Sequence, residues 1–388
     1  MLEPQIYRAN EALAKTMIPN WRIAQVHNLD HFERVGFPVR LGSIREIGQI
    51  IDTMQENRFE PFLRELGGVA GDEYARIVEA CRSSVEFQLT YLPHRPPVLP
   101  ISTLLSSFAL YRKLQAASPK FRSVLEIGPG CGYLSFFLRN HPGLDNYSQI
   151  EACESFYILQ NLVNLHCFGA RFDERALPPQ ENSAVDFFTT PKSDLETGPR
   201  VRVERPPKCS HFPWWRIGEV LSRDLRFDLV TSNANLLEFN PTALDDYLTV
   251  LHRVLDPGGL MVMQCSGHVT PGVNDDRVLL TKMRTAGFVP LFYVVSGEPI
   301  GFPGGRARGL LSRLSDGALD AVSLVMTNAL FVKTGHPLFE RYYDERVADL
   351  RFVAPEDVVR EVFFERPPKR KFPTMQQFLE DTEHALLG

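Results

Sequence analysis

The stretch that most constrains this chain is 124–138, VLEIGPGCGYLSFFL, in which three glycines stand at alternate positions between two apolar segments. The first segment carries an acid, Glu126, and the second begins at Tyr133. Glycine adopts positive φ and has no Cβ, so such a turn can bend sharply and let a ligand approach its backbone. A helix that follows at once offers unpaired N–H groups. The stretch therefore predicts a strand, a glycine turn and a helix. This arrangement suits a nucleoside-bearing cofactor, although the same turn also serves simple strand-to-helix packing.

Composition limits the class of protein. The chain has 388 residues, of which 44% are hydrophobic and 23% charged, which is typical of a globular protein with one large domain and a second small one. Its 42 basic and 47 acidic residues leave a net charge of -5, which gives no electrostatic case for a nucleic-acid partner. No apolar run approaches the roughly 18 residues that a membrane span needs, and residues 1–10 lack a signal-peptide pattern. We expect a cytoplasmic protein that binds neither nucleic acid nor membrane.

The chain divides into three parts. Residues 1–98 place apolar side chains three and four positions apart and predict a helical N-terminal domain. Residues 101–335 alternate strand and helix patterns, interrupted by a polar insertion at 171–200 that is longer than most connections in an α/β unit. Residues 336–388 form a C-terminal extension. The N-terminal helices could shape an acceptor pocket on their own domain or pack against a second subunit, so a homodimer stays open.

A second strand is predicted at 147–154, and it ends in an acid, Glu154. Glu154 lies 22 residues after Gly132, close to the interval of about 20 residues at which a carboxylate reaches the ribose hydroxyls in nucleotide-binding folds. A carboxylate at this place could instead interact with the dipole of the helix that follows. The glycine turn upstream favours the ribose role.

The strand pattern in 226–240, RFDLVTSNANLLEFN, ends in polar residues that include Asn233, Asn235 and Glu238. A helix starting at Pro241 follows, and the turn LDPGG leads into another buried strand. Two late strands are joined without a long helix, which predicts an antiparallel hairpin at one edge of the sheet. The fold class expected is α/β, a doubly wound, Rossmann-like, mostly parallel sheet with an antiparallel edge hairpin.

This order of motifs resembles the class I S-adenosylmethionine-dependent methyltransferases. The resemblance rests on the E-x-G-x-G-x-G turn, the acid after the second strand, the segment FDLV…N…L-x-E, the L-x-PGG turn and the late hairpin, and it covers about residues 101–335. The adjacent tryptophans after a proline, the segment SNANLLEF and the helical N-terminal region are also similar to sugar O-methyltransferases of natural-product and surface-glycan pathways. NANLLEF departs from the usual residues of that second family.

The resemblance implies S-adenosylmethionine as cofactor and assigns roles to particular residues. Glu126 would lie near the amino acid end of the cofactor, and Glu154 would hold the ribose hydroxyls. Asn233 would face the transferred methyl group. The backbone of the turn would contact the cofactor through Gly128, Gly130 and Gly132, and the adenine position would be occupied by Ser210, His211 and Phe212, without the acid that the family usually has there.

Methyl transfer to a hydroxyl needs alignment and a base, which should come from loops at the carboxyl ends of the strands. His268, just after the strand LMVMQCSG, is the first candidate, and Glu238 and Asn235 follow. Each could instead be a surface or helix-capping residue. No residue spacing indicates a metal site. We therefore expect O-methylation of a small-molecule acceptor such as a sugar or a natural-product intermediate. The alternatives are N- or C-methylation of a small metabolite, or a partner protein with the cofactor fold but no catalysis.

Overall fold

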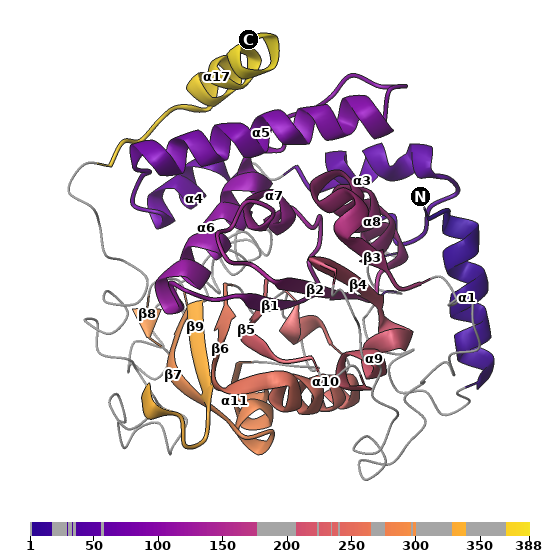
Figure 1. Ribbon diagram of the computed structural model, residues 1–388, viewed down its shortest axis with the longest axis vertical. Coiled ribbons are helices and arrows are strands. Elements are labelled where there is room, and N and C mark those ends of the chain that lie inside the picture. The colour runs from indigo at the N-terminus through magenta and orange to yellow at the C-terminus, as the bar shows by residue number, and fades with distance from the viewer. Residues whose placement is uncertain are drawn as a thin grey trace, which may run out of the picture.

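A computed structural model describes residues 2–17, 29, 33, 36–55, 58–176, 207–222, 225–233, 235–239, 241–264, 276–295, 298–299, 328–338 and 370–388. Its centre is a nine-stranded sheet with the order β3-β4-β2-β1-β5-β6-β9-β7-β8. Helices cover both faces of this sheet (Figure 1). The architecture confirms the predicted α/β class.

Six neighbouring strands of the sheet are parallel. They are β1 (Ser123–Ile127), β2 (Asn146–Glu151), β3 (Phe172–Glu174), β4 (Cys209–Pro213), β5 (Phe227–Ser232) and β6 (Leu255–Met263). The chain builds β2, β3 and β4 on one side of β1, then returns to add β5 and β6 on the other side. This reversal of strand order next to β1 creates the crevice at the carboxyl ends of the strands where open α/β sheets bind ligands.

The far edge of the sheet is antiparallel, as the sequence predicted. β9 (Asn328–Lys333) lies between β6 and β7 (Phe288–Val295) and runs antiparallel to both. The short β8 (Glu298–Pro299) pairs with the end of β7. This edge lies on the side of the sheet remote from β2 and β4.

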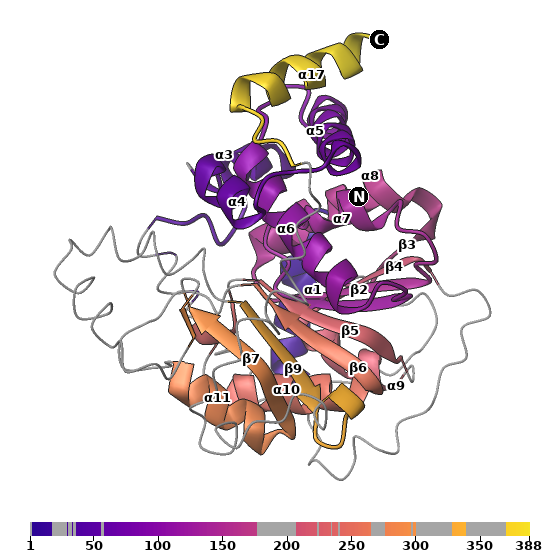
Figure 2. The ribbon, with the colours of Figure 1, turned by 90° about the vertical axis from the view of Figure 1, so that its left-hand side faces the viewer.

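Two layers of helices enclose the sheet (Figure 2). One layer contains α6 (Ile101–Ala117), α7 (Leu134–Leu138) and α8 (Glu154–Phe168), and the other contains α9 (Ile217–Ser222), α10 (Pro241–Val254) and α11 (Asp276–Thr285). Three short 3-10 turns connect elements of this region, at Gly169–Arg171, Trp214–Arg216 and Leu236–Glu238. α8 ends at Phe168, and Gly169 directly after it has a φ of 53°, a positive value that glycine adopts readily.

Further helices come from both ends of the sequence. α1 (Pro4–Met17) runs beside the sheet (Figure 1). The other elements lie outside the first layer, and they are the 3-10 turn Ile44–Glu46, α3 (Ile47–Thr53), α4 (Phe59–Glu65), α5 (Gly71–Tyr91) and α17 (Met375–Leu387). α17 lies along α5 (Figure 1). One continuous apolar core runs through these helices and the sheet, from Leu2 to Phe378. The domain boundaries at 98, 101 and 335 remain predictions.

Several local predictions need correction. β2 ends at Glu151 rather than Glu154, because the chain turns at Ala152 and Cys153 and Glu154 is already helical. α6 begins at Ile101, directly after Pro100, so Ser102 lies inside this helix and does not cap it. Part of the predicted insertion, Phe172–Glu174, forms the edge strand β3, whereas 177–206 lie outside the described residues.

Candidate functional site

The glycine turn joins the end of β1 to α7 at the crevice. Gly128, Gly130 and Gly132 all have positive φ, of 60°, 58° and 72°, which explains why side chains with a Cβ are disfavoured at these positions. Their surroundings differ. A Cβ on Gly128 would lie 1.9 Å from Nδ2 of Asn235, and one on Gly132 would lie 2.9 Å from Cγ of Gln160. A Cβ on Gly130 would meet nothing within 4 Å, so the turn is open at its central glycine.

Glu151 is the acid that ends β2. Its Oε1 accepts hydrogen bonds from the backbone N–H groups of Ala152, at 2.7 Å, and Cys153, at 2.8 Å. Its Oε2 accepts one from Nε2 of Gln160 at 2.8 Å. Burial raises the pKa of Glu151, and these hydrogen bonds oppose that rise. A carboxylate therefore stands beside the open part of the glycine turn, at the end of the neighbouring strand.

Glu154, the residue predicted to hold a ribose, is bound by two arginines. Arg8 of α1 donates to both oxygens of its carboxylate, at 2.9 and 2.7 Å. Arg40 donates at 2.7 Å and the backbone N–H of Leu41 at 3.1 Å. The side chain of Glu154 is fully buried under these donors. Its ribose role stays a prediction, but the observed contacts fasten the N-terminal segment to the start of α8.

Glu126 lies inside the sheet, one residue before the end of β1, and is 2% exposed. Burial raises its pKa to about 7, although the hydroxyl of Tyr147 and the amide of Gln149 donate hydrogen bonds to it. The network continues through Asn164, whose Nδ2 donates to Oε1 of Gln149 at 2.5 Å, to Ser135, whose Oγ donates to Oδ1 of Asn164 at 2.7 Å. Glu126 is thus the end of a buried polar chain beneath the glycine turn.

Ser210 and His211, predicted near an adenine, lie within β4 rather than after it. Both are buried, and His211 stacks on Tyr157 of α8 with the ring centroids 3.8 Å apart. Burial lowers the pKa of His211 to about 3, so its ring is neutral. The residues that directly follow the end of β4, at Pro213, are Trp214 and Trp215.

The two tryptophans after β4 are buried and contact α1. The indole N–H of Trp214 donates to Glu11 at 3.2 Å, and the ring of Trp215 makes an edge contact with Tyr7 at 4.7 Å between centroids. Glu11 also pairs with Arg40 at 2.8 Å. α1 therefore packs over the carboxyl ends of β2 and β4, which the sequence did not indicate.

The residues predicted after β5 have separate roles in the structure. Asn235 is buried, and its Nδ2 donates to the carbonyl oxygens of Ile127 and Gly128 while its Oδ1 accepts from Oγ of Ser232. It braces the glycine turn. Asn233 and Glu238 are both half-buried and lie at the end of β5 and in the 3-10 turn that follows. His268, the first candidate base, lies outside the described residues.

The carboxyl end of β6 carries a polar group that sequence reasoning missed. Gln264 is 2% exposed, accepts from Nζ of Lys113 at 3.0 Å and donates to the carbonyl and Oγ of Ser106, both at 3.0 Å. Its backbone N–H also donates to Ser232 at 3.4 Å. Because Lys113 and Ser106 lie on a helix before β1, only the three-dimensional fold brings them to the end of β6.

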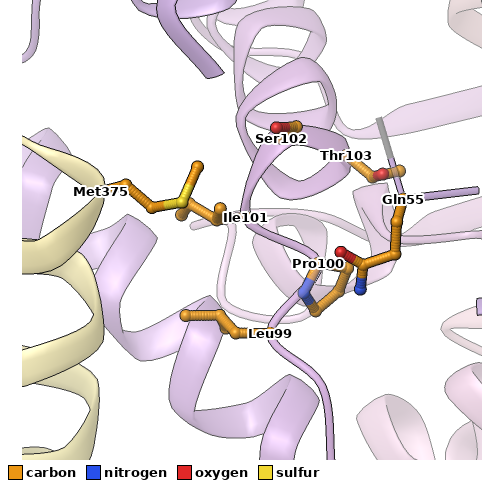
Figure 3. A pocket seen from close by; sticks show the side chains of 7 residues that line it. All are labelled: Gln55, Leu99, Pro100, Ile101, Ser102, Thr103 and Met375. Atoms are coloured by element: carbon orange, nitrogen blue, oxygen red, sulfur yellow. The ribbon is translucent and has the colours of Figure 1, made fainter. Parts of the chain in front are cut away.

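A cavity of about 300 Å³ lies at the beginning of α6 (Figure 3). Met375 of α17 and the side chain of Gln55 lie on opposite sides of it, and the rest of its lining comes from Leu99, Pro100, Ile101, Ser102 and Thr103. None of these residues belongs to the sheet or to the glycine turn. The cavity is therefore separate from the candidate site.

The described residues also bear on the presence of metal sites, membrane-spanning helices and disulfides. Within them, no group of three or more His, Cys, Asp or Glu side chains is arranged to hold a metal ion. None of the helices described there is long and apolar enough to cross a membrane. Five cysteines of this region are free thiols, four of them buried, whereas Cys265 lies outside it.

Sequence reasoning missed Glu151 and Gln160. A signal for Glu151 was present, since it follows Gly132 by 19 residues and thus also fits the interval of about 20 residues. The choice between Glu151 and Glu154 as the ribose-binding acid depended on where β2 ends, and a single sequence places the end of a strand only to within about 2 to 4 residues. Gln160 gave no signal, because a glutamine on an apolar helix carries no motif.

Comparison with known proteins adds similarities of fold. No family model and no curated protein matches the sequence. An O-methyltransferase from a trans-AT polyketide synthase of Brevibacillus brevis, solved with S-adenosyl-L-homocysteine, is 12% identical, with 75% of this chain and 94% of that chain covered and a TM-score of 0.36. A geranyl diphosphate methyltransferase solved with its methyl donor is 11% identical, with coverages of 61% and 88% and a TM-score of 0.35. The cyclase SpnF is 15% identical, with coverages of 60% and 81% and a TM-score of 0.33.

The aligned structures thus include S-adenosylmethionine-dependent methyltransferases, the class that the sequence motifs resemble.

Proposed function

We propose that this chain is an S-adenosylmethionine-dependent methyltransferase that methylates a hydroxyl of a small molecule. The observation that carries the proposal is the pairing of an open glycine turn with a carboxylate at the end of the next strand. Gly130 has free space where a Cβ would stand, and Glu151 lies beside the turn at the crevice where strand order reverses. These are the features with which such folds hold a nucleoside.

The residues around the crevice fit the parts of this cofactor. We assign the ribose hydroxyls to Glu151, because the predicted Glu154 already accepts five hydrogen bonds from Arg8, Arg40 and Leu41 of the N-terminal segment. The turn backbone at Gly130 would approach the cofactor most closely, and Asn233 would lie toward the methionine part. When bound, the cofactor supplies an electrophilic methyl group on a sulfonium sulfur.

The protein's task is then to hold the acceptor in line with the methyl group and to exclude water. The acceptor hydroxyl must give up a proton, and His268 and Glu238 remain the proposed bases. We give Asn235 a positioning role, because its amide is bound to the backbone of Ile127 and Gly128. A sugar or natural-product intermediate as acceptor and a cytoplasmic location also remain predictions, as does the homodimer that the sequence leaves open.

Calorimetry with S-adenosylhomocysteine tests the cofactor assignment. Wild type should bind. Glu151→Ala should weaken binding at least tenfold, because hydrogen bonds to a charged group contribute about 1.5 to 3 kcal/mol. Gly130→Val should also weaken it at least tenfold, because the valine side chain would fill the open space at the centre of the turn. Glu154→Ala is the matched control, since Glu154 is a buried acid three residues further along the chain at the start of α8, and it should change affinity about threefold or less. A larger loss of affinity in Glu154→Ala than in Glu151→Ala would return the ribose role to Glu154, and no binding by wild type would refute the cofactor.

A further inference from the structure

Gln160 connects three parts of the candidate site with one side chain. It lies on α8, is fully buried, and its Nε2 donates to the carbonyl oxygen of Gly130 at 2.6 Å and to Oε2 of Glu151 at 2.8 Å. Its Oε1 lies 2.8 Å from Nε2 of His211. The glycine turn after β1, the acid at the end of β2 and the histidine of β4 thus meet on a single amide.

The chemistry of the partners fixes the orientation of this amide. A carbonyl oxygen and a carboxylate oxygen both accept hydrogen bonds, so the Gln160 atom that faces them must be the NH₂ group. Oε1 then faces His211, whose neutral ring must carry its proton on Nε2 in order to donate. Nδ1 of His211 is left buried without a hydrogen-bond partner among the described residues.

The two oxygens of Glu151 are held by different means. Backbone N–H groups of Ala152 and Cys153 hold Oε1, and these belong to the same turn of the chain. Oε2 is held by Gln160. The rotation of the carboxylate plane therefore depends on Gln160, and two vicinal hydroxyls can be bound together only if that plane is correctly set.

Gln160 also limits the shape of the turn. Its Cγ stands 2.9 Å from where a Cβ on Gly132 would be, so α8 and the turn are in close contact at this point. A residue of similar volume could fill the same space without making the three hydrogen bonds. Packing and polar positioning can therefore be separated by substitution.

We infer that Gln160 is a positioning residue for the cofactor, which sets the Glu151 carboxylate and the Gly130 carbonyl for binding and is itself oriented by His211. The inference rests on the proposed function and adds a residue that acts through Glu151 rather than on the cofactor directly.

Gln160→Leu tests it against a matched control, Asn164→Leu. Asn164 lies one helical turn further along α8 and is equally buried, and its two side-chain hydrogen bonds go to Gln149 and Ser135 rather than to Gly130 or Glu151. Both variants lose buried hydrogen bonds and should lose similar thermal stability. Only Gln160→Leu should raise the dissociation constant for S-adenosylhomocysteine tenfold or more, whereas Asn164→Leu should change it threefold or less.

Gln160→Glu provides a readout that a purely structural role would not move. The new carboxylate would face Glu151 of β2 and His211 of β4, and Tyr157 of α8 stacks on that histidine. Glu151 also interacts electrostatically with Glu126 of β1, Tyr7 of α1, Cys153 before α8 and Tyr247 of α10, and these groups are unchanged in wild type and variant. Two carboxylates this close share a proton as pH falls, which restores a donor to Glu151. The affinity of Gln160→Glu relative to wild type should therefore rise at least fivefold between pH 8 and pH 6.

The outcomes separate the two proposals. If wild type binds S-adenosylhomocysteine but Gln160→Leu loses no more affinity than Asn164→Leu, Gln160 is structural only and the inference is overturned. If Gln160→Leu does not fold, the pH series of Gln160→Glu decides, and a ratio to wild type that is independent of pH overturns the inference. Failure of wild type to bind is instead a failure of the proposed function.

Discussion

At the scale of single residues, Gly128 and Asn235 are in close contact, and the side chain of Asn235 requires a glycine at position 128. Gly128 has a φ of 60° and the Asn235 amide occupies the space of its missing Cβ, whereas Gly130 has a similar φ of 58° and open space. The two glycines therefore allow the cost of backbone conformation to be separated from the cost of a close contact.

We expect Gly130→Ala to reduce the free energy of unfolding by about 1 to 2 kcal/mol, the cost of a left-handed residue with a Cβ. Gly128→Ala should cost at least another ~1 to 3 kcal/mol, because the amide of Asn235 must leave its buried acceptors. In the Asn235→Ala background this extra cost should largely disappear. Urea unfolding of the four single and double variants measures these terms, and an unchanged extra cost in the double variant would show that Asn235 is not the obstacle.

Glu126 is a second residue whose environment predicts a measurable effect. Its pKa is about 7 in the folded protein against 4.5 for the ordinary group, because burial disfavours the charged form. Between these pH values the folded state holds more protons than the unfolded state, so the contribution of Glu126 to stability falls as pH rises and is constant above pH 7.

Glu126→Gln should therefore gain stability over wild type as pH rises from 5 to 7.5, by ~3 kcal/mol at most. Glutamine imitates the protonated acid and can still accept the hydrogen bond from Tyr147. Urea unfolding across this pH range is the measurement. Parallel pH profiles for variant and wild type would mean that Glu126 does not titrate in this window.

At the scale of elements, α1 is held at the crevice by polar contacts. Arg8 and Arg40 converge on Glu154, and Glu11 connects Arg40 to Trp214. Arg8 is partly exposed, so water can replace it in the ion pair with Glu154 more easily than it could replace a buried arginine. The attachment of α1 can thus depend on these contacts while the stability of the sheet does not.

Arg8→Ala should increase hydrogen exchange of the α1 amides about tenfold, since it removes charge-assisted hydrogen bonds to a buried carboxylate. Lys15→Ala on the same helix is the control, because the Lys15 side chain is 42% exposed and makes one ion pair, with Glu11 at 3.3 Å, and one cation-π contact, 6.0 Å from the centre of the Trp214 ring. Amides of β1 and β2 should not change in either variant. Equal exchange of α1 in the two variants would show that Glu154 does not anchor the helix.

The elements also show what a single sequence can and cannot predict. The α/β class, the glycine turn, the start of α10 at Pro241 and the antiparallel edge were predictable, because they depend on local patterns of apolar, glycine and proline residues. The end of β2 was wrong by three residues, since Cys153 and Ala152 continue the apolar pattern of the strand. The contacts of Arg8 with Glu154 and of Gln160 with His211 join residues far apart in the sequence and follow no period.

At the scale of the whole molecule, the two ends of the sequence meet in the outer helices. The backbone of Val69 pairs with that of Lys371, and Phe378 of α17 is fully buried beside Phe59 and Tyr74. The side chain of Arg370 is 6% exposed and donates to the carbonyl oxygens of Leu66 and Gly68. Arg370 is therefore buried although it stands in a short basic run of the sequence, because the chain folds back onto α4 and α5.

The same core that contains Phe378 reaches the sheet, which makes the attachment of α17 part of the global stability. Phe378→Ala should reduce the free energy of unfolding by about 3 to 5 kcal/mol if α17 unfolds together with the rest, the range for a buried phenylalanine. Leu379→Ala is the matched control, because Leu379 is the next residue of the same helix and 42% exposed, and it should cost under ~1 kcal/mol. Neither residue approaches the glycine turn, so affinity for S-adenosylhomocysteine should stay unchanged in both. A loss below about 1 kcal/mol in Phe378→Ala, with faster hydrogen exchange confined to α17, would instead mean that this helix detaches on its own before the core unfolds.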